Sequence, residues 1–167
     1  QRFDAAVAAA RAARAVVVFA WNEGTEGRDR RSLQVAEEQN ALVAAVAAAN
    51  PRTVVVLNTG DPVTMPWLAR VPAVLEMWYP GQEGAEATVT FLAGDESPGG
   101  RLPVPFPRRR EDTPVAPPLR YPGVDGRQEY SEGIFVGYRW YDQEMIEPLF
   151  PFPYTFPNLA GNLYGYG

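Results

Sequence analysis

Two short runs of β-branched residues constrain the fold of this chain more than any other feature of its sequence. Residues 15–20 (AVVVFA) and 53–57 (TVVVL) are almost entirely apolar. A continuous apolar run, as opposed to an alternating one, is typical of a strand buried on both faces of a parallel sheet. We therefore expect these runs to be neighbouring central strands, nearly free of solvent. Further strands are predicted at 73–77 (AVLEM) and at 102–106.

Helical patterns alternate with these strands. Alanine-rich segments at 3–14 and 34–49 precede the first two strands, and a helix is predicted at 83–93. Pro51 ends the second helix because proline cannot continue the hydrogen-bond ladder, and residues 65–70 allow only a short helix. Strands and helices in alternation favour parallel pairing with right-handed crossovers. The sequence thus predicts an α/β fold, with a doubly wound, mostly parallel sheet sandwiched by helices.

The last third of the chain has a different character. Twelve of the seventeen prolines lie at or after Pro98. Residues 108–126 show no periodicity, which indicates either a long ordered arm or a partly disordered loop. A further strand is predicted at 134–141 (IFVGYRWY). We accordingly divide the chain into a sandwich core at 1–107 and, at 108–167, a proline-rich arm with a C-terminal strand that completes the same domain.

The composition excludes several kinds of chemistry. The 167 residues include no cysteine and no histidine, and every basic residue is arginine. Thiol nucleophiles, Ser-His-Asp triads, zinc sites with Cys or His ligands and Schiff-base lysines are therefore excluded. Neither a dinucleotide fingerprint nor a phosphate loop occurs, and we predict no metal and no cofactor. Proton transfer near neutral pH would need a tyrosine or a carboxyl group with a raised pKa.

Charge and hydropathy narrow the possible partners. The formal net charge is −5, which disfavours binding to nucleic acid and to anionic membranes. No apolar run approaches the 18 residues of a membrane span. The chain starts directly in a helical pattern, and we expect it to be part of a longer protein.

Three predicted loops meet at the carboxyl ends of the strands, where open parallel sheets bind their ligands. They cover residues 21–33, 58–66 and 78–83. The first (WNEGTEGRDRRSL) sets Glu23 and Glu26 among glycines, acids and arginines. A carboxyl group there could be desolvated enough to hold a proton at neutral pH. The alternative is a solvated loop whose acids and arginines form surface ion pairs.

Aromatic residues flank the same edge. Trp21 opens the first loop, and Trp78 and Tyr79 open the third. Such rings suit sugars, whose C–H groups pack on aromatic faces, and we take the three as candidate substrate-binding residues. Packing at the rim of the core is the alternative. Residues 58–61 (NTGD) are predicted to be a structural turn.

Four segments, in order along the chain, resemble one family. They are 53–68 (TVVVLNTGDPVTMPWL), 73–84 (AVLEMWYPGQEG), 94–107 (GDESPGGRLPVPFP) and 121–142 (YPGVDGRQEYSEGIFVGYRWYD). Together they resemble the C-terminal α/β sandwich domain of glycoside hydrolase family 3, the β-glucosidase family. The resemblance runs from the first helix to about Phe152.

The resemblance implies that the two catalytic residues lie on two different domains. Members of this family carry a (β/α)8 barrel before the sandwich and hydrolyse β-glycosides with retention of configuration. The nucleophile is an aspartate on the barrel, which this sequence lacks. The general acid/base of many members is a glutamate on a sandwich loop that reaches over the mouth of the barrel.

The resemblance also assigns residues. The family pattern ends in Glu-Gly-x-Asp-Arg, matched here by residues 26–30 (EGRDR). It implies that Glu26 is the acid/base, with Glu23 in reserve, and that Asp29 and Arg30 brace the loop. Glu132 is interpreted as structural. The family continues after a segment like 148–152 with a glycine-rich turn, whereas here 153–156 (PYTF) follows at once.

Two functional hypotheses follow. In the first, the chain is the acid/base-bearing domain of a retaining β-glucosidase-like enzyme that releases terminal β-D-glucosyl residues, and it is inactive without the barrel. In the second, it is a non-catalytic sugar-binding or interaction module derived from that domain. Retention needs two carboxyl groups about 5–5.5 Å apart, so one loop glutamate alone is half an active site.

Overall fold

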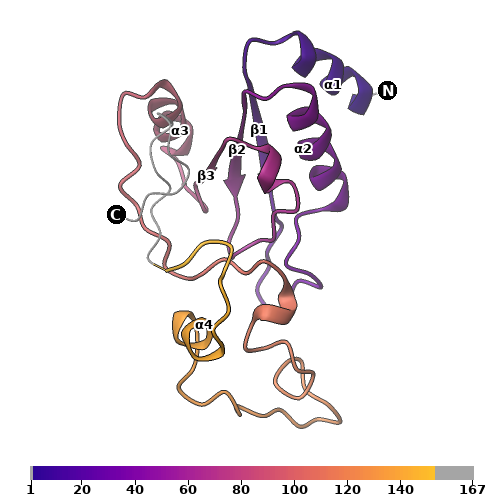
Figure 1. Cartoon of the computed structure of the whole chain (residues 1–167), viewed down its shortest axis with the longest axis vertical. Helices are drawn as coiled ribbons and strands as arrows, with labels where there is room; N and C mark the ends of the chain where they lie inside the picture. Colours follow the sequence, from indigo (N-terminus) through magenta and orange to yellow (C-terminus); the bar gives the residue numbers. More distant parts are fainter. Residues whose placement is uncertain (1, 153–167) are drawn as a thin grey trace. The chain divides into compact units, whose positions relative to one another are not determined.

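A computed structural model of the chain describes residues 2–152. Three parallel strands form its sheet, in the order β1 (Val16–Trp21), β2 (Thr53–Asn58) and β3 (Ala73–Glu76) (Figure 1). In the register of the first pair, Val18 lies opposite Val55. The predicted α/β fold with a parallel sheet is confirmed.

The helices lie close to their predicted positions. They are α1 (Arg2–Ala12), α2 (Glu37–Ala49) and α3 (Gly84–Ala93), with a short 3-10 helix at Leu68–Arg70. The first two pack side by side (Figure 1). Among the described residues, no helix is long and apolar enough to cross a membrane.

Asn50 joins the end of α2 to the end of α1 and the start of β2. Its amide nitrogen donates to the carbonyl oxygens of Ala10 and Ala13, each at 2.9 Å. Its own carbonyl accepts the hydroxyl of Thr53 at 2.6 Å. Asn50 therefore connects two helices and a strand through its side-chain amide and its backbone carbonyl.

The core centres on β2. Val55, Val56 and Leu57 are fully buried, and Val43 of α2 is buried as deeply. This agrees with the expectation that the second apolar run is a central strand.

The same expectation is wrong for β1. Val17, Phe19 and Trp21 are 43%, 52% and 51% exposed, while Val18 and Ala20 between them are buried. The strand lies at the edge of the sheet with β2 as its one described neighbour, and one of its faces is uncovered. In a continuous apolar run the residues on both faces of the strand are apolar. The sequence therefore could not show which face is exposed to solvent.

The side-chain amide of Gln39 forms hydrogen bonds with the backbone at the end of β1. The backbone N–H of Trp21 donates to the side-chain oxygen of Gln39 at 2.8 Å, and the Gln39 amide donates back to the Trp21 carbonyl at 3.0 Å. Gln39 lies in the first turn of α2. It offers Trp21 the donor and the acceptor that a neighbouring strand would otherwise present.

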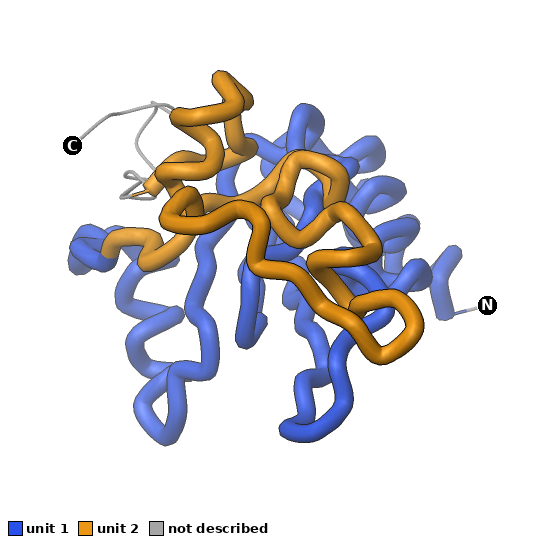
Figure 2. The backbone as a smooth tube through the Cα atoms, turned by 90° about the horizontal axis from the view of Figure 1, so that it is seen from below, with its two compact units in different colours: residues 1–100, 155–167 blue, residues 101–154 orange. Residues whose placement is uncertain are grey.

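A second compact unit begins at Arg101, and Figure 2 colours the two units separately. The sequence placed the division after residue 107. The unit contains a 3-10 helix (Arg110–Asp112) and α4 (Tyr138–Glu144). Phe106 and Phe150 pair through their backbones and through rings that meet edge to face at 6.2 Å.

Two strands predicted in this region are wrong. At 102–106 the backbone forms only one isolated bridge, between Phe106 and Phe150. At 134–141, turns lead into α4. Gly133 and Gly137 have φ values of +59° and +57°, which interrupt an extended backbone despite the β-branched and aromatic side chains around them. The tail at 153–167 lies outside the described residues.

Candidate functional site

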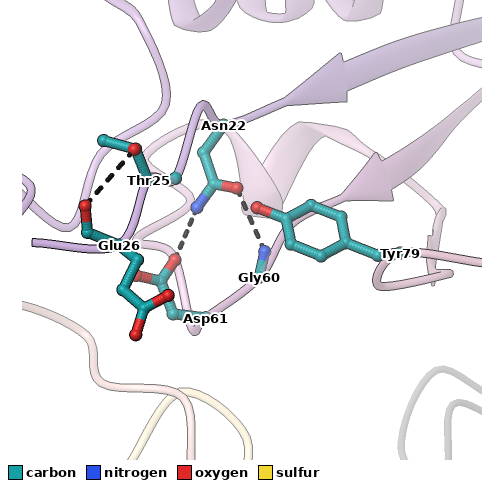
Figure 3. A pocket seen from close by; sticks show the side chains of 7 residues that line it. Asn22, Thr25, Glu26, Gly60, Asp61 and Tyr79 are labelled. Atoms are coloured by element: carbon teal, nitrogen blue, oxygen red, sulfur yellow. Dashed lines mark hydrogen bonds between the residues drawn. The ribbon is translucent and has the colours of Figure 1, made fainter.

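An open hollow of about 310 Å³ lies at the carboxyl edge of the sheet (Figure 3). All three loops that the sequence assigned to this edge contribute to it. Its lining residues are Asn22, Gly24, Thr25, Glu26, Gly60, Asp61 and Tyr79.

Asn22 and Asp61 hold the floor of the hollow together. The Asn22 side chain donates to the Asp61 carboxylate and accepts the backbone N–H of Gly60 at 3.1 Å (Figure 3). Asp61 also forms an ion pair with Arg30, which donates in turn to the Gln34 carbonyl at 2.8 Å. These contacts tie the first loop to the second.

Tyr79 forms one wall of the hollow and depends on two glycines. A Cβ atom at Gly60 would lie 2.6 Å from the Tyr79 hydroxyl oxygen, and one at Gly24 would lie 3.1 Å from it. The tyrosine side chain is nevertheless 62% exposed. Its ring therefore rests on bare backbone and presents most of its surface to solvent.

Glu26 lines the same hollow as Asp61 (Figure 3). Its side chain is exposed, as is that of Glu23, which does not line the hollow. Asp61 is engaged by Arg30 and Asn22. Both contacts reach Oδ1 of Asp61, whose side chain is 44% exposed, and Glu26 is the more exposed of the two lining acids.

The predicted aromatic residues separate in space. Tyr79 lines the hollow, whereas Trp21 and Trp78 do not. Trp21 belongs to the exposed face of β1. Trp78 is half-buried and has a φ of +54°, in the left-handed region that non-glycine residues rarely adopt.

Glu76 is a feature of this edge that the sequence reasoning missed. It ends β3, is only 9% exposed, and accepts the backbone N–H of Trp78 at 2.7 Å. Burial raises the pKa of Glu76 from its ordinary value of 4.5 to about 7, although hydrogen bonds from Trp78 and Thr59 act in the opposite direction. A carboxyl group inside the apolar run AVLEM was the signal that could have revealed it.

Asn22 and Asp61 were also missed as lining residues. Asn22 was not singled out within the first loop, and residues 58–61 were interpreted only as a turn. Arg30 braces the first loop through Asp61. Glu132 lies in the second unit, where Arg120 approaches it at 3.5 Å and also stacks over Trp140 at 5.0 Å. Within residues 2–152, no group of three or more acidic side chains is arranged to hold a metal ion.

Comparison with known proteins identifies close relatives. The model of the "Glycosyl hydrolase family 3 C-terminal domain" matches residues 1–138. A beta-glucosidase of Rhizobium radiobacter is 49% identical over 152 residues, which is 88% of this chain and 19% of that protein. Beta-glucosidase B of Emericella nidulans is 47% identical over 144 residues, covering 78% of this chain and 17% of the relative.

Solved structures give the same result. DesR, a beta-glucosidase from Streptomyces venezuelae determined in complex with D-glucose, has a TM-score of 0.88 and 56% identity, and the match covers 90% of this chain and 19% of DesR. The beta-glucosidase of Kluyveromyces marxianus, also determined with glucose, has a TM-score of 0.87 and 36% identity, covering 93% and 19%. The chain thus spans about a fifth of the length of the relatives that it matches.

Proposed function

The chain belongs to the C-terminal domain family of glycosyl hydrolase family 3, and from this premise we propose that it is the acid/base-bearing domain of a retaining β-glucosidase-like enzyme. The substrate would be a β-glucoside or a small oligosaccharide with a terminal β-D-glucosyl residue. The names of the relatives support a glycosidase as the activity of the complete protein.

One observation carries the assignment of the acid/base. Glu26 places a solvent-accessible carboxyl group in the hollow at the carboxyl edge of the sheet, next to the exposed ring of Tyr79. Glu23, three residues earlier, does not line this hollow. Glu26 is therefore the better candidate of the two, and Tyr79 is the better candidate for contact with a sugar among the three aromatic residues.

The proposed chemistry needs a second carboxyl group from elsewhere. A nucleophile attacks the anomeric carbon while Glu26 gives a proton to the leaving oxygen, and Glu26 then takes a proton from the water that releases the sugar. Asp61 is less suited as the nucleophile because Arg30 and Asn22 hold its Oδ1 in the contacts that join the first two loops. We propose that a (β/α)8 barrel supplies the nucleophile and that this chain alone is inactive.

Complementation tests the proposal directly. The chain is mixed with a separately produced barrel domain from a relative, and hydrolysis of an aryl β-glucoside is measured. Activity in the mixture but in neither part alone supports the proposal, and a mixture with Glu26→Gln should lose most of that activity while one with Glu23→Gln retains it.

The exposed ring of Tyr79 beside the hollow also fits a module that only binds sugar. An inert mixture that still binds glucose would favour that function over hydrolysis.

A further inference from the structure

The proton count at Thr59 points to a role for Glu76. The Thr59 hydroxyl oxygen lies 2.9 Å from the backbone carbonyl oxygen of Asp61 and 3.0 Å from Oε2 of Glu76. The hydroxyl has one proton, and the carbonyl can only accept. If the hydroxyl donates to Asp61, the contact to Glu76 is a hydrogen bond only when Oε2 carries a proton of its own.

The second carboxyl oxygen holds the opposite loop. Oε1 of Glu76 accepts the backbone N–H of Trp78 at 2.7 Å and faces that of Thr59 at 3.4 Å. Trp78 keeps its left-handed backbone at this point, directly before Tyr79. One buried side chain therefore holds the loop that carries Asp61 and the loop that carries Tyr79.

The surrounding charges favour the neutral carboxylic acid. Asp61, in the loop after β2, faces Glu76 and its negative charge adds to the effect of burial, which raises the pKa of Glu76. Arg30 forms its ion pair with Asp61, and the loop after β3 meets Glu76 with the backbone of Trp78. Loss of the proton would leave a buried carboxylate that competes with Asp61 for the single Thr59 proton.

We propose that Glu76 is a positioning residue which, as a neutral acid, fixes the Thr59–Asp61 and Trp78–Tyr79 loops in the shape of the hollow, and which on ionisation draws the Thr59 hydroxyl proton away from the Asp61 carbonyl and loosens the Thr59–Asp61 loop. This proposal concerns only the shape of the hollow, so it does not depend on which ligand the hollow binds. Its effect on Glu26 chemistry rests on the proposed function.

Glutamine is the informative replacement at this position. In Glu76→Gln, the amide oxygen can accept from Trp78 and the amide N–H can donate to Thr59, as the neutral acid does, but the side chain cannot ionise. Glu86→Gln makes the same chemical change on α3, where the side chain is exposed. It serves as the matched control.

The test follows the intact chain by NMR between pH 5 and 9. The carboxyl carbon of Glu76 should titrate near neutral pH. Exchange of the Gly60 amide, which lies between Thr59 and Asp61, divided by its intrinsic rate, should rise roughly tenfold for each pH unit above the pKa, because each unit lowers the protonated fraction tenfold. The Trp78 amide donates to Glu76 in both protonation states, so its relative exchange rate should not rise. Glu86→Gln should behave as the unmodified chain does, and Glu76→Gln should lose the rise.

A carboxyl carbon that titrates near pH 4.5 would overturn the proposal, as would a Gly60 amide whose relative exchange rate stays level in the unmodified chain. The titration of the unmodified chain decides this even if Glu76→Gln does not fold. In the complete enzyme, Glu76→Gln should extend activity toward alkaline pH. Absence of glycosidase activity in every version would count against the proposed function and leave the NMR result intact.

Discussion

At the scale of single residues, Glu26 is the side chain on which the proposed reaction depends. In the complete enzyme, Glu26→Gln keeps the size of the side chain and removes its proton, and loss of general acid help typically costs about 10²–10⁴ in rate. The loss should be small for formation of the glycosyl-enzyme from aryl glucosides with good leaving groups, and large for alkyl glucosides. Steady-state and burst kinetics on both substrate types measure it.

Azide supplies the control for the second half of the reaction. It attacks the glycosyl-enzyme without help from a base, so it should restore turnover in Glu26→Gln. Glu23→Gln should show neither the dependence on leaving group nor the rescue. The opposite pattern would move the acid/base to Glu23.

Glu76 makes stability depend on pH in a defined direction. Its pKa is raised from 4.5 to about 7 in the folded chain, so between these values the folded state binds the proton more strongly than the unfolded state does. The stabilisation is complete below pH 4.5 and is lost as the pH rises through 7, by on the order of 3 kcal/mol.

Denaturant unfolding of the unmodified chain and of Glu76→Gln at several pH values measures this effect. The difference in unfolding free energy between them should change from pH 5 to pH 8 in favour of the glutamine variant. A constant difference would show that Glu76 does not titrate in that window.

At the scale of elements, the two apolar strands should respond very differently to substitution. Leu57→Ala in fully buried β2 should cost about 2–5 kcal/mol of unfolding free energy, because it removes buried methyl groups and leaves a cavity. Phe19→Thr on the exposed face of β1 should cost less than about 1 kcal/mol. Equal losses in urea unfolding would mean that the face of β1 is covered in solution.

The local hydrophobic pattern of the sequence was sufficient to predict the helices and strands of the first unit. It was insufficient to predict which of their faces other parts of the chain cover. The valine runs and alanine-rich helices predicted β1, β2, β3, α1 and α2, because burial and periodicity leave a direct mark on composition. The exposed face of β1 depends on what packs above it, and α4 depends on two glycines that break an extended backbone.

The same reasoning applies to the site, where the roles of Glu26 and Tyr79 stay predictions. The sequence placed their loops at this edge, and the family resemblance singled out Glu26. Asn22, Asp61 and Glu76 act through hydrogen bonds across loops, and such partners are fixed only when the strands are in register.

At the scale of the whole molecule, both units expose large apolar side chains. Phe19 and Trp21 are about half exposed in the first unit, and Tyr130, Ile134 and Met145 in the second are 78%, 72% and 91% exposed. Where such side chains gather into one patch, they mark a site of contact with other protein. We expect the chain alone to bind an apolar dye, and to do so less in the context of a complete family member.

Dye fluorescence and sedimentation test this expectation. Phe19→Thr combined with Ile134→Thr should lower dye binding by the isolated chain. Val89→Thr, which alters one exposed side chain on α3, should not. Equal dye binding by the isolated chain and the complete protein would contradict the expectation.

The amide of Gln39 has a consequence for aggregation. Edge strands invite identical chains to add on and grow into fibrils, and proteins blunt them in various ways. The Gln39 side chain already forms hydrogen bonds with both the backbone N–H and the carbonyl of Trp21. A strand from another chain therefore could not form backbone hydrogen bonds with Trp21 without displacing Gln39. The hydrogen bonds of Gln39 thus oppose the edge-to-edge addition of further chains at the end of β1.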